Sequence, residues 1–286
     1  MNSLSLQERF ERFLNENLPK VESFHPHFEQ ALREMLDVGG KRFRPLLLLN
    51  VVESATPLLV ENALPVALGL EMMHTYSLIH DDLPCMDNAP LRRGHATLHV
   101  SYDETTAVLI GDALNTHAFY LIAHAPLSAQ TRIELVDVLA RDAGVYGMVL
   151  GQAIDCFFED KRLSIDELSF LHTHKTAKLI AASLAMGAII AGLDKKVQES
   201  LYAFGLNLGL LFQVQDDIID ATLSSAEAGK PTLNDGHKNS YVNLLGLEGA
   251  TAQKEKVLRE LFHALAMFDD TLSQRLKGVI ETYFKR

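Results

Sequence analysis

Two clusters of aspartates follow apolar stretches of this chain, and their residue types suit metal chemistry. The first cluster occupies residues 79–87 (IHDDLPCMD) and the second occupies residues 212–220 (FQVQDDIID). Within the second cluster, Asp216 and Asp220 are four residues apart and therefore share one face of a helix. Carboxylates without His or Cys in ligand register suit hard cations such as Mg²⁺, which keeps water ligands and accepts substrate phosphates. One such cluster could be a solvated helix end, but two of them favour a metal-diphosphate site between helices.

The proline inside the first cluster decides whether all of its aspartates can act together. In an unbroken helix Asp87 would lie about 240° around the axis from Asp81, at about 100° per residue. Pro84 disfavours helical geometry at Leu83 and can end the helix there. We therefore predict that the chain turns after Leu83 and brings Asp87 back towards Asp81.

Basic residues near the aspartates could bind anions. The stretch 39–45 (GGKRFRP) places Lys41 and Arg44 where both could face one anion, beside the N-terminus of the next helix. The pair at 92–93 offers arginine forks that match phosphate oxygens. His74 lies two turns before the first cluster, although a lone His on an apolar helix more often packs in the core. Together these groups indicate two anionic ligands, one held through metal and one held directly by cations.

We expect helices to carry these residues, because the hydrophobic spacing is helical nearly everywhere. There is no fixed repeat, low-complexity tract or Ser/Gly linker, so we predict one all-α domain over residues 1–286. The stretch 224–240 is rich in Gly, Pro, Asn and Asp and predicts a mobile surface loop. The predicted helical segments are 4–17, 26–38, 46–52, 62–83, 104–124, 128–158, 165–192, 194–223 and 250–284.

Composition excludes several classes of protein. Apolar residues make up 48% of the 286 residues and charged residues 22%, so disorder is not the main state. Aromatic residues are only 7%, which disfavours an all-β fold, and the net charge of −11 makes nucleic acid an improbable partner. Two cysteines cannot form a disulfide framework, which fits a reducing cytoplasm. The apolar stretch 179–193 is shorter than the roughly 20 residues of a bilayer span, so we expect a buried helix there and no membrane span.

The five strongest motifs resemble those of the trans-prenyltransferase (isoprenyl diphosphate synthase) family, in the same order along the chain. The resemblance is greatest to the bacterial members that make farnesyl diphosphate, which share the longer spacing of the first aspartate motif. It implies the isoprenoid synthase fold, an antiparallel helix bundle around a deep central cavity, as a single polyprenyl synthetase domain. The motifs are GGKRFRP at 39–45, EMMHTYSLIHDDLPCMDN at 71–88, LRRG at 91–94, HKT at 174–176 and FQVQDDIID at 212–220.

The resemblance assigns roles to individual residues. The implied metal ligands, for three Mg²⁺ ions, are Asp81, Asp87 and Asp216, with Asp82 and Asp220 in support. The implied ligands of the allylic diphosphate are Arg92, Lys175 and Lys230, and those of isopentenyl diphosphate are Lys41, Arg44, His74 and Arg93. Thr176 and Gln213 are expected near the allylic carbon. The resulting catalytic set is Asp81, Asp82, Asp87, Lys175, Thr176, Gln213 and Asp216.

The implied reaction is a Mg²⁺-dependent 1'-4 condensation of isopentenyl diphosphate with dimethylallyl and then geranyl diphosphate, which gives farnesyl diphosphate (C15). Tyr76 lies about 7.5 Å before Asp81 along the helix, and an aromatic residue there would block longer products, unless it is an ordinary packed Tyr. Geranyl or geranylgeranyl diphosphate remain alternative products, and a non-catalytic prenyltransferase subunit remains an alternative role. A terpene cyclase needs no second diphosphate site, so the basic set of Lys41, Arg44 and His74 argues against that class of enzyme. The family also implies a homodimer.

The sequence departs from the family pattern at a few positions. Ala89 and Pro90 replace the usual acidic pair, Ala177 replaces a glycine, and Val242 replaces a proline. None of these changes removes a predicted metal ligand or diphosphate-binding cation. They bear instead on rate, substrate preference and the closure of the loop 224–240, which the resemblance implies to be a lid over the cavity.

Overall fold

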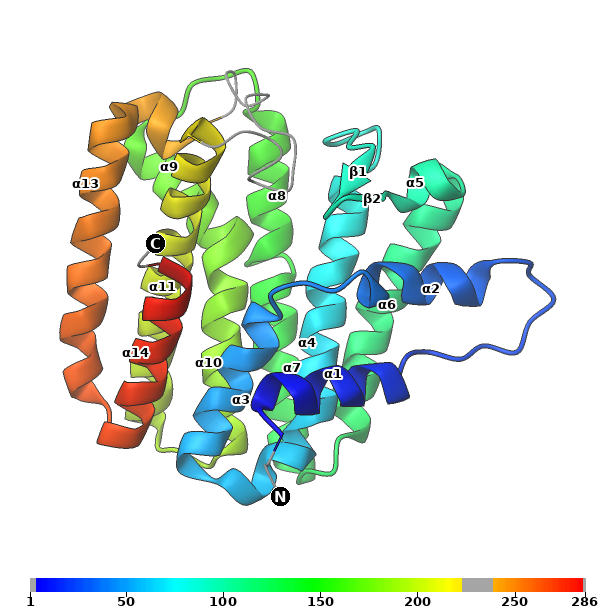
Figure 1. Cartoon of the computed structure of the whole chain (residues 1–286), viewed down its shortest axis with the longest axis horizontal. Coiled ribbons are helices and arrows are strands. Elements are labelled where there is room, and N and C mark those ends of the chain that lie inside the picture. Colours follow the sequence, from blue (N-terminus) through cyan, green and yellow to red (C-terminus); the bar gives the residue numbers. More distant parts are fainter. Residues whose placement is uncertain (1–3, 223–238, 285–286) are drawn as a thin grey trace.

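The computed structural model describes residues 4–222 and 239–284, and these residues form a bundle of helices that run up and down. Figure 1 shows the bundle from the side on which the first two helices cross it. The all-α prediction is confirmed. The helices of the bundle are α3 (Phe43–Ala55), α4 (Val60–Asp81), α6 (Glu104–His124), α7 (Ala129–Ala143), α8 (Met148–Phe157), α9 (Ile165–His172), α10 (Lys178–Ile190), α11 (Lys195–Thr222), α13 (Tyr241–Ala264) and α14 (Asp270–Phe284).

Shorter elements join and cover the bundle. The turn of the β1–β2 hairpin holds Arg93 and Gly94, whose φ angles of 54° and 79° are both positive, as a tight hairpin turn requires. No strand was expected from the sequence. The shorter elements are α1 (Leu6–Glu16), α2 (Phe28–Asp37), α5 (Leu98–Ser101), the strands β1 (Leu91–Arg92) and β2 (His95–Ala96), the 3₁₀ turns Pro57–Leu59 and Leu265–Met267, and a π-helical turn, Thr173–Ala177.

The core consists mainly of two hydrophobic clusters. One lies around α4 and α6, and the other around α11 and α14. The helix α10 packs against α3, α7 and α11 and is buried on almost every face, because its sequence is apolar all round. It is therefore the buried helix predicted for the stretch 179–193. Within the described residues, no helix is both long enough and apolar enough to span a membrane.

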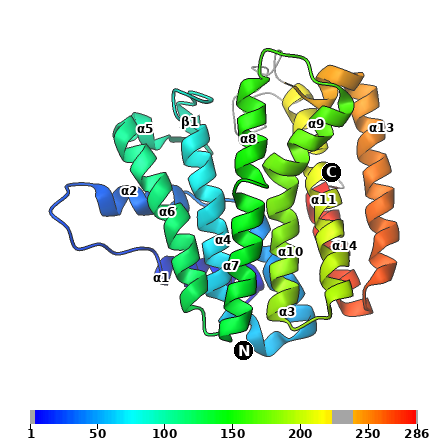
Figure 2. The ribbon, with the colours of Figure 1, turned by 180° about the vertical axis from the view of Figure 1, so that it is seen from behind.

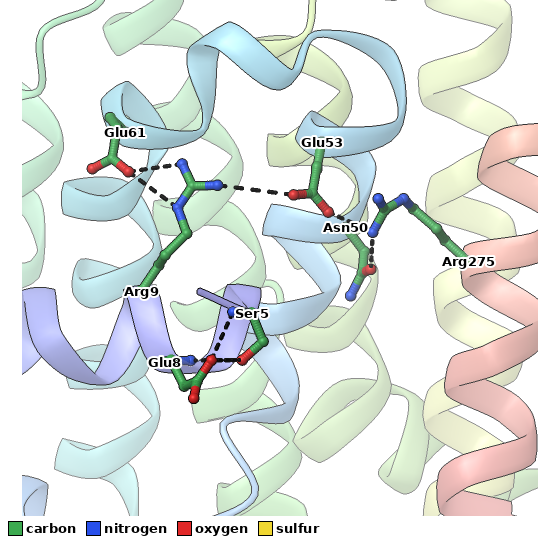
Figure 3. Close-up of polar contacts among 7 residues, drawn as sticks. All are labelled: Ser5, Glu8, Arg9, Asn50, Glu53, Glu61 and Arg275. Carbon is green, nitrogen blue, oxygen red and sulfur yellow. Dashed lines mark hydrogen bonds and ion pairs between the residues drawn. The ribbon is translucent and has the colours of Figure 1, made fainter. Parts of the chain in front are cut away.

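A group of charges fastens α1 across the bundle (Figure 3). Arg9 of α1 reaches Glu61 of α4, with 2.7 Å between Nη2 and Oε1, and Glu53 of α3, at 3.8 Å. On its other side, Glu53 pairs with Arg275 of α14 at 2.5 Å. Each exposed pair adds little stability alone, but together they tie four helices at one corner. The position of α1 is thereby set relative to α3 and α4.

Some predicted segments are divided in the structure. The segment 128–158 is two helices, because α7 ends at Gly144 and α8 begins after Gly147. The segment 165–192 contains the π-helical turn, and the last segment begins at Tyr241 rather than at 250 and breaks before α14. Helix α6 spans 104–124 as predicted. Of the predicted loop 224–240, residues 224–238 lie outside the described residues.

The two aspartate clusters come to the same end of the bundle. Helices α4 and α11 both end at the upper side of Figure 1, where the β1–β2 hairpin also lies. Seen from behind in Figure 2, α8 stands between α4 and the pair formed by α9 and α10. The π-helical turn between α9 and α10 packs on both α8 and α11. These elements therefore surround one site.

Candidate active site

A cavity of about 1170 Å³ opens between these helix ends and the 39–44 loop. It confirms the deep central cavity, and nearly every predicted site residue borders it. Asp82 lies behind the wall, and Lys230 lies outside the described residues. The bordering predicted residues are Lys41, Arg44, His74, Tyr76, Asp81, Asp87, Arg92, Arg93, Lys175, Thr176, Gln213, Asp216 and Asp220.

The first aspartate cluster turns back on itself as the proline predicts. Helix α4 ends at Asp81, and the backbone N–H of Asp87 donates to the carbonyl oxygen of Asp81 at 2.9 Å. Burial raises the pKa of Asp81 to about 6, Lys175 partly opposes this shift, and Asp87 adds to it. A buried carboxylate with a like charge beside it is a site that a cation would stabilise.

Asp82 points away from the cavity and holds the hairpin. It is 2% exposed, accepts a hydrogen bond from Arg92 Nε at 2.7 Å and forms an ion pair with Arg92 Nη2 at 2.6 Å. The pair joins the end of α4 to β1 and fixes the side chain of Arg92 at the cavity edge. The predicted supporting role of Asp82 in metal binding stays a prediction, and the structure adds this role in placing Arg92.

Lys175 reaches the cavity from the π-helical turn, which packs very closely on α8. A Cβ atom at Gly151 would lie 2.1 Å from the backbone nitrogen of Lys175, so only glycine allows this approach. One turn further along α8, Asp155 accepts a hydrogen bond from Lys175 Nζ at 2.5 Å. Burial acts to lower the pKa of Lys175, but Asp155 and Asp81 outweigh it and the pKa is raised. Sequence reasoning did not assign Asp155, although it follows the Gly151-Gln152 pair by one turn.

The helix α11 contributes two pairs to the site. Thr176 donates to the side-chain oxygen of Gln213 at 2.6 Å, which joins the two residues predicted near the allylic carbon. Asp217, which sequence reasoning did not single out, accepts from the backbone N–H of Tyr241 at 2.7 Å. Asp217 therefore links the end of α11 to the start of α13.

A second group of cations lies beside the aspartates. The Nε atom of Arg44 is buried without a hydrogen-bond partner, and burial lowers the pKa of this residue to about 10. Burial and the neighbouring arginines, Arg44 first, hold the pKa of His74 well below its usual value. Arg93 donates to the carbonyl oxygen of Gly39 and so packs against the 39–44 loop. Buried cations with unused donors fit an anionic ligand.

Backbone strain is concentrated at this site. In residues 4–222 and 239–284, the non-glycine residues with positive φ are Arg42, Asn88 and Arg93, at 46°, 46° and 54°. All three line the cavity. Left-handed backbone is unfavourable for residues with a side chain and persists only where surrounding contacts hold it. The loops that carry the predicted diphosphate ligands are therefore held in shape by their surroundings.

The residues present fit a magnesium site that is completed by substrate. Within the described residues, no three His, Cys, Asp or Glu side chains lie together as a ready metal cage. Mg²⁺ does not need one, because it usually takes one or two carboxylates and fills its remaining positions with phosphate oxygens and water. Asp81 and Asp87 on one wall, and Asp216 and Asp220 on α11, offer oxygen ligands of this kind.

The family model for polyprenyl synthetase matches residues 25–276. The chain belongs to the polyprenyl synthetase family. It is a short-chain prenyltransferase, and the resemblance drawn from its motifs is confirmed. The match to the family model includes the residues around the cavity, since all five motifs lie within the matched residues.

Individual relatives cover almost the whole chain. A farnesyl diphosphate synthase of Micrococcus luteus is 39% identical over 286 residues, 97% of this chain and 97% of its own length. The structure of a geranyltransferase from Helicobacter pylori, complexed with magnesium and isoprenyl diphosphate, superposes with a TM-score of 0.94 at 48% identity and covers 100% of both chains. Geranylgeranyl pyrophosphate synthase 4 of Arabidopsis thaliana is 38% identical over 97% of this chain and 74% of its own length.

Proposed function

We propose that this prenyltransferase condenses isopentenyl diphosphate with dimethylallyl and then geranyl diphosphate, with Mg²⁺ present, and releases farnesyl diphosphate. The observation that carries the proposal is that two groups of cations border one cavity, and each group supports a separate anion site. The charges acting on Asp81 include Lys175 and Arg92, whereas those acting on Arg44 are Glu71 and Arg93. A cyclase, which binds one diphosphate, leaves the second set without a use.

The acidic site is suited to the allylic diphosphate. Mg²⁺, three ions in our proposal, would bind at Asp81, Asp87, Asp216 and Asp220 and neutralise the charge of the leaving diphosphate. Arg92 and Lys175 contact the same diphosphate, and Asp82 and Asp155 hold these two cations in place before substrate arrives. Lys230, which we also assign to this diphosphate, stays a prediction.

The cationic site orients the second substrate. Arg44, Arg93, Lys41 and neutral His74 bind the diphosphate of isopentenyl diphosphate, so that its double bond lies against the allylic carbon. The allylic C–O bond breaks, a bond forms between C1' of the allylic group and C4 of isopentenyl diphosphate, and the released diphosphate accepts the proton that is lost. The oxygens at Thr176 and Gln213 face the developing positive charge, and the cavity walls exclude water that would capture it.

Product length follows from the floor of the cavity. Tyr76 borders the cavity and is 8% exposed, with its ring edge-on to His80 at 5.6 Å between centroids. Helix α6 packs along α4, and His80 lies against it with 3.1 Å between its Nε2 atom and the carbonyl oxygen of Val108. We assign Tyr76 the role of stopping elongation at C15. Geranylgeranyl diphosphate is the second candidate product, because one of the relatives is named as a geranylgeranyl pyrophosphate synthase.

We also propose that the enzyme acts as a homodimer in the cytoplasm. The family resemblance suggests the dimer, and a stripe of exposed apolar side chains on α6 supports it. Val108 and Leu109 are exposed near the start of this helix and Tyr120 is exposed near its end. Exposed apolar side chains that gather on one element are a feature of protein interfaces. The second copy would cover this stripe.

Product analysis tests the activity. Purified protein is incubated with MgCl₂, isopentenyl diphosphate and dimethylallyl diphosphate, and chain lengths are identified by mass spectrometry after dephosphorylation. We expect a C15 product that disappears with EDTA. Asp216→Asn should lower kcat on the order of 10²-fold or more. Asp137→Asn, at an exposed aspartate of α7, is the matched control and should stay within about twofold of the wild type.

The outcomes separate the candidate functions. A C20 product would keep the mechanism and assign the enzyme to geranylgeranyl diphosphate. Folded protein that makes no product from either dimethylallyl or geranyl diphosphate would contradict catalysis and favour a non-catalytic subunit. Turnover that persists in EDTA would exclude the metal assignment.

A further inference from the structure

The central arginine of the 39–45 motif has its guanidinium group bound by protein groups, whereas the buried Nε atom of Arg44 has no hydrogen-bond partner. Arg42 is 2% exposed, and its backbone is left-handed with a φ of 46°. It stands directly after Lys41 and two residues before Arg44, both of which we assign to isopentenyl diphosphate. Its backbone conformation therefore sets the direction of the chain between two substrate ligands.

Three elements bind the guanidinium group of Arg42. It donates to Glu71 of α4 at 2.9 Å, to Glu11 of α1 at 3.0 Å, and to the backbone oxygen of Leu36 in α2 at 2.7 Å. Burial acts to lower the pKa of Arg42, but these two carboxylates outweigh it and the pKa is raised. The residue stays charged, and its hydrogen bonds hold a strained turn against three helices.

Glu71 is the buried carboxylate that Arg42 binds and that could otherwise pair with the neighbouring arginines. It is 2% exposed, borders the cavity, and lies one turn before His74 on α4. Its charge acts on both Arg44 and Arg93, the cations of the second anion site. A carboxylate released at this position would pair with those arginines and compete with a diphosphate. Arg42 engages Glu71 and so leaves the other two arginines available.

We propose that Arg42 is a positioning residue for isopentenyl diphosphate, which pins the 39–44 loop to α1 and α4 and withholds Glu71 from Arg44 and Arg93. The inference rests on the proposed function of the second anion site. The position of α1 matters to it, because the ion pairs of Arg9 with Glu53 and Glu61 fasten the helix that carries Glu11. Arg42 acts through its neighbours and does not touch the reacting atoms.

Steady-state kinetics of the full-length enzyme test this role. Arg42→Met should raise the KM for isopentenyl diphosphate at least tenfold and leave the KM for geranyl diphosphate within twofold. The double variant Arg42→Met/Glu71→Gln should recover most of that loss, because it removes the carboxylate that competes with the substrate. Removal of the unpaired buried carboxylate would restore stability for a purely structural arginine as well. The diagnostic result is therefore the selective rise and recovery of the KM for isopentenyl diphosphate while the KM for geranyl diphosphate stays unchanged. Arg12→Met, at an exposed arginine of α1, is the matched control and should leave both KM values unchanged.

Two further measurements separate the positioning role of Arg42 from a loss of folding or of turnover. If Arg42→Met does not fold, Arg42→Lys and Glu11→Gln remove part of the network and should raise the KM for isopentenyl diphosphate alone. Calorimetry with isopentenyl diphosphate as the probe then reports binding without turnover. An unchanged KM, an equal rise of both KM values, or the absence of recovery in the double variant overturns the positioning role. A wild type that binds isopentenyl diphosphate without making product overturns the proposed function, and the calorimetric comparison still decides the role of Arg42.

Discussion

At the scale of the residue, the cations of the cavity are held by acidic partners before any substrate binds. Arg92 is paired with Asp82, and Lys175 with Asp155. Asp82 is buried, so removal of Arg92 would leave its charge unpaired at a cost of about 3–5 kcal/mol. Lys175 and Asp155 are 26% and 24% exposed, so loss of either one costs less. The partners therefore fix the direction of each cation. Preorganised charge of this kind is what stabilises a developing diphosphate anion.

Tyr76→Ala tests the residue that we place at the floor of the cavity. Loss of the ring deepens the cavity, so we expect the main product to shift from C15 to C20 or longer. The change should also lower stability by about 3 kcal/mol, because a large, nearly buried side chain is removed. Product length is read by mass spectrometry, and folding is checked by circular dichroism.

The control for this prediction is Tyr76→Phe, which keeps the ring and removes only the hydroxyl group. We expect it to make C15, since the volume of the ring and not its hydrogen bonding blocks the chain. If Tyr76→Ala also makes only C15, the floor is formed by other residues and Tyr76 is an ordinary packed side chain.

At the scale of the element, the π-helical turn decides where Lys175 and Thr176 lie. Its five residues, Thr173–Ala177, are contacted by α8 on one side and α11 on the other. The sequence predicts a continuous helix over 165–192, because a single wider turn hardly changes the spacing of the apolar residues. Such turns are common at functional sites, where they move a side chain out of regular helical register.

Gly151→Ala tests the contact between α8 and this turn. The added Cβ atom would meet backbone at 2.1 Å, so the two elements must separate. We expect the free energy of unfolding to fall by about 1–3 kcal/mol. We also expect kcat to fall on the order of 10-fold or more, because Lys175 is displaced. Thermal unfolding and steady-state kinetics measure the two effects.

Gly278→Ala is the matched control, since nothing lies within 4 Å of a Cβ atom at this position in α14. It should stabilise the protein by about 0.5–1 kcal/mol, as alanine is the better helix former. Equal behaviour of the two variants would show that the α8 contact is not tight.

The bounds of the helices were predictable where both ends carry a local signal. The segment 104–124 matches α6, which begins after Asp103, a side chain that accepts from the backbone N–H of Thr106. The segment 128–158 was wrong as one helix, because Gly144 and Gly147 are both tolerated in an apolar helical pattern. Whether a glycine ends a helix depends on what packs beside it.

At the scale of the whole molecule, the exposed stripe on α6 predicts the oligomeric state. Leu109→Lys places a charge among these exposed apolar side chains and should shift the protein from dimer to monomer at micromolar concentration, because an unpaired charge is costly to bury. Size-exclusion chromatography with light scattering measures the mass. Leu58→Lys, at a leucine exposed in the turn before α4, is the control and should leave the dimer intact. A wild type that is monomeric would contradict the homodimer.

Local chemistry in the sequence determined the fold class, the two aspartate clusters and the turn that returns Asp87 to Asp81. These features depend on spacing, helical period and the fixed φ of Pro84, all of which act over a few residues. The same strings carried the family resemblance. For this reason, nearly all of the residues that the motifs assign to the site border the cavity.

Only the tertiary structure decided which charges pair. Asp82 holds Arg92, Asp155 holds Lys175, and Glu71 holds Arg42, although sequence reasoning assigned no such partners. These pairs form where separate helices or loops approach within hydrogen-bond distance, and that approach is set by packing between elements. No pattern along the chain encodes it, because a charged side chain has the same local sequence whether it meets substrate, water or a buried partner.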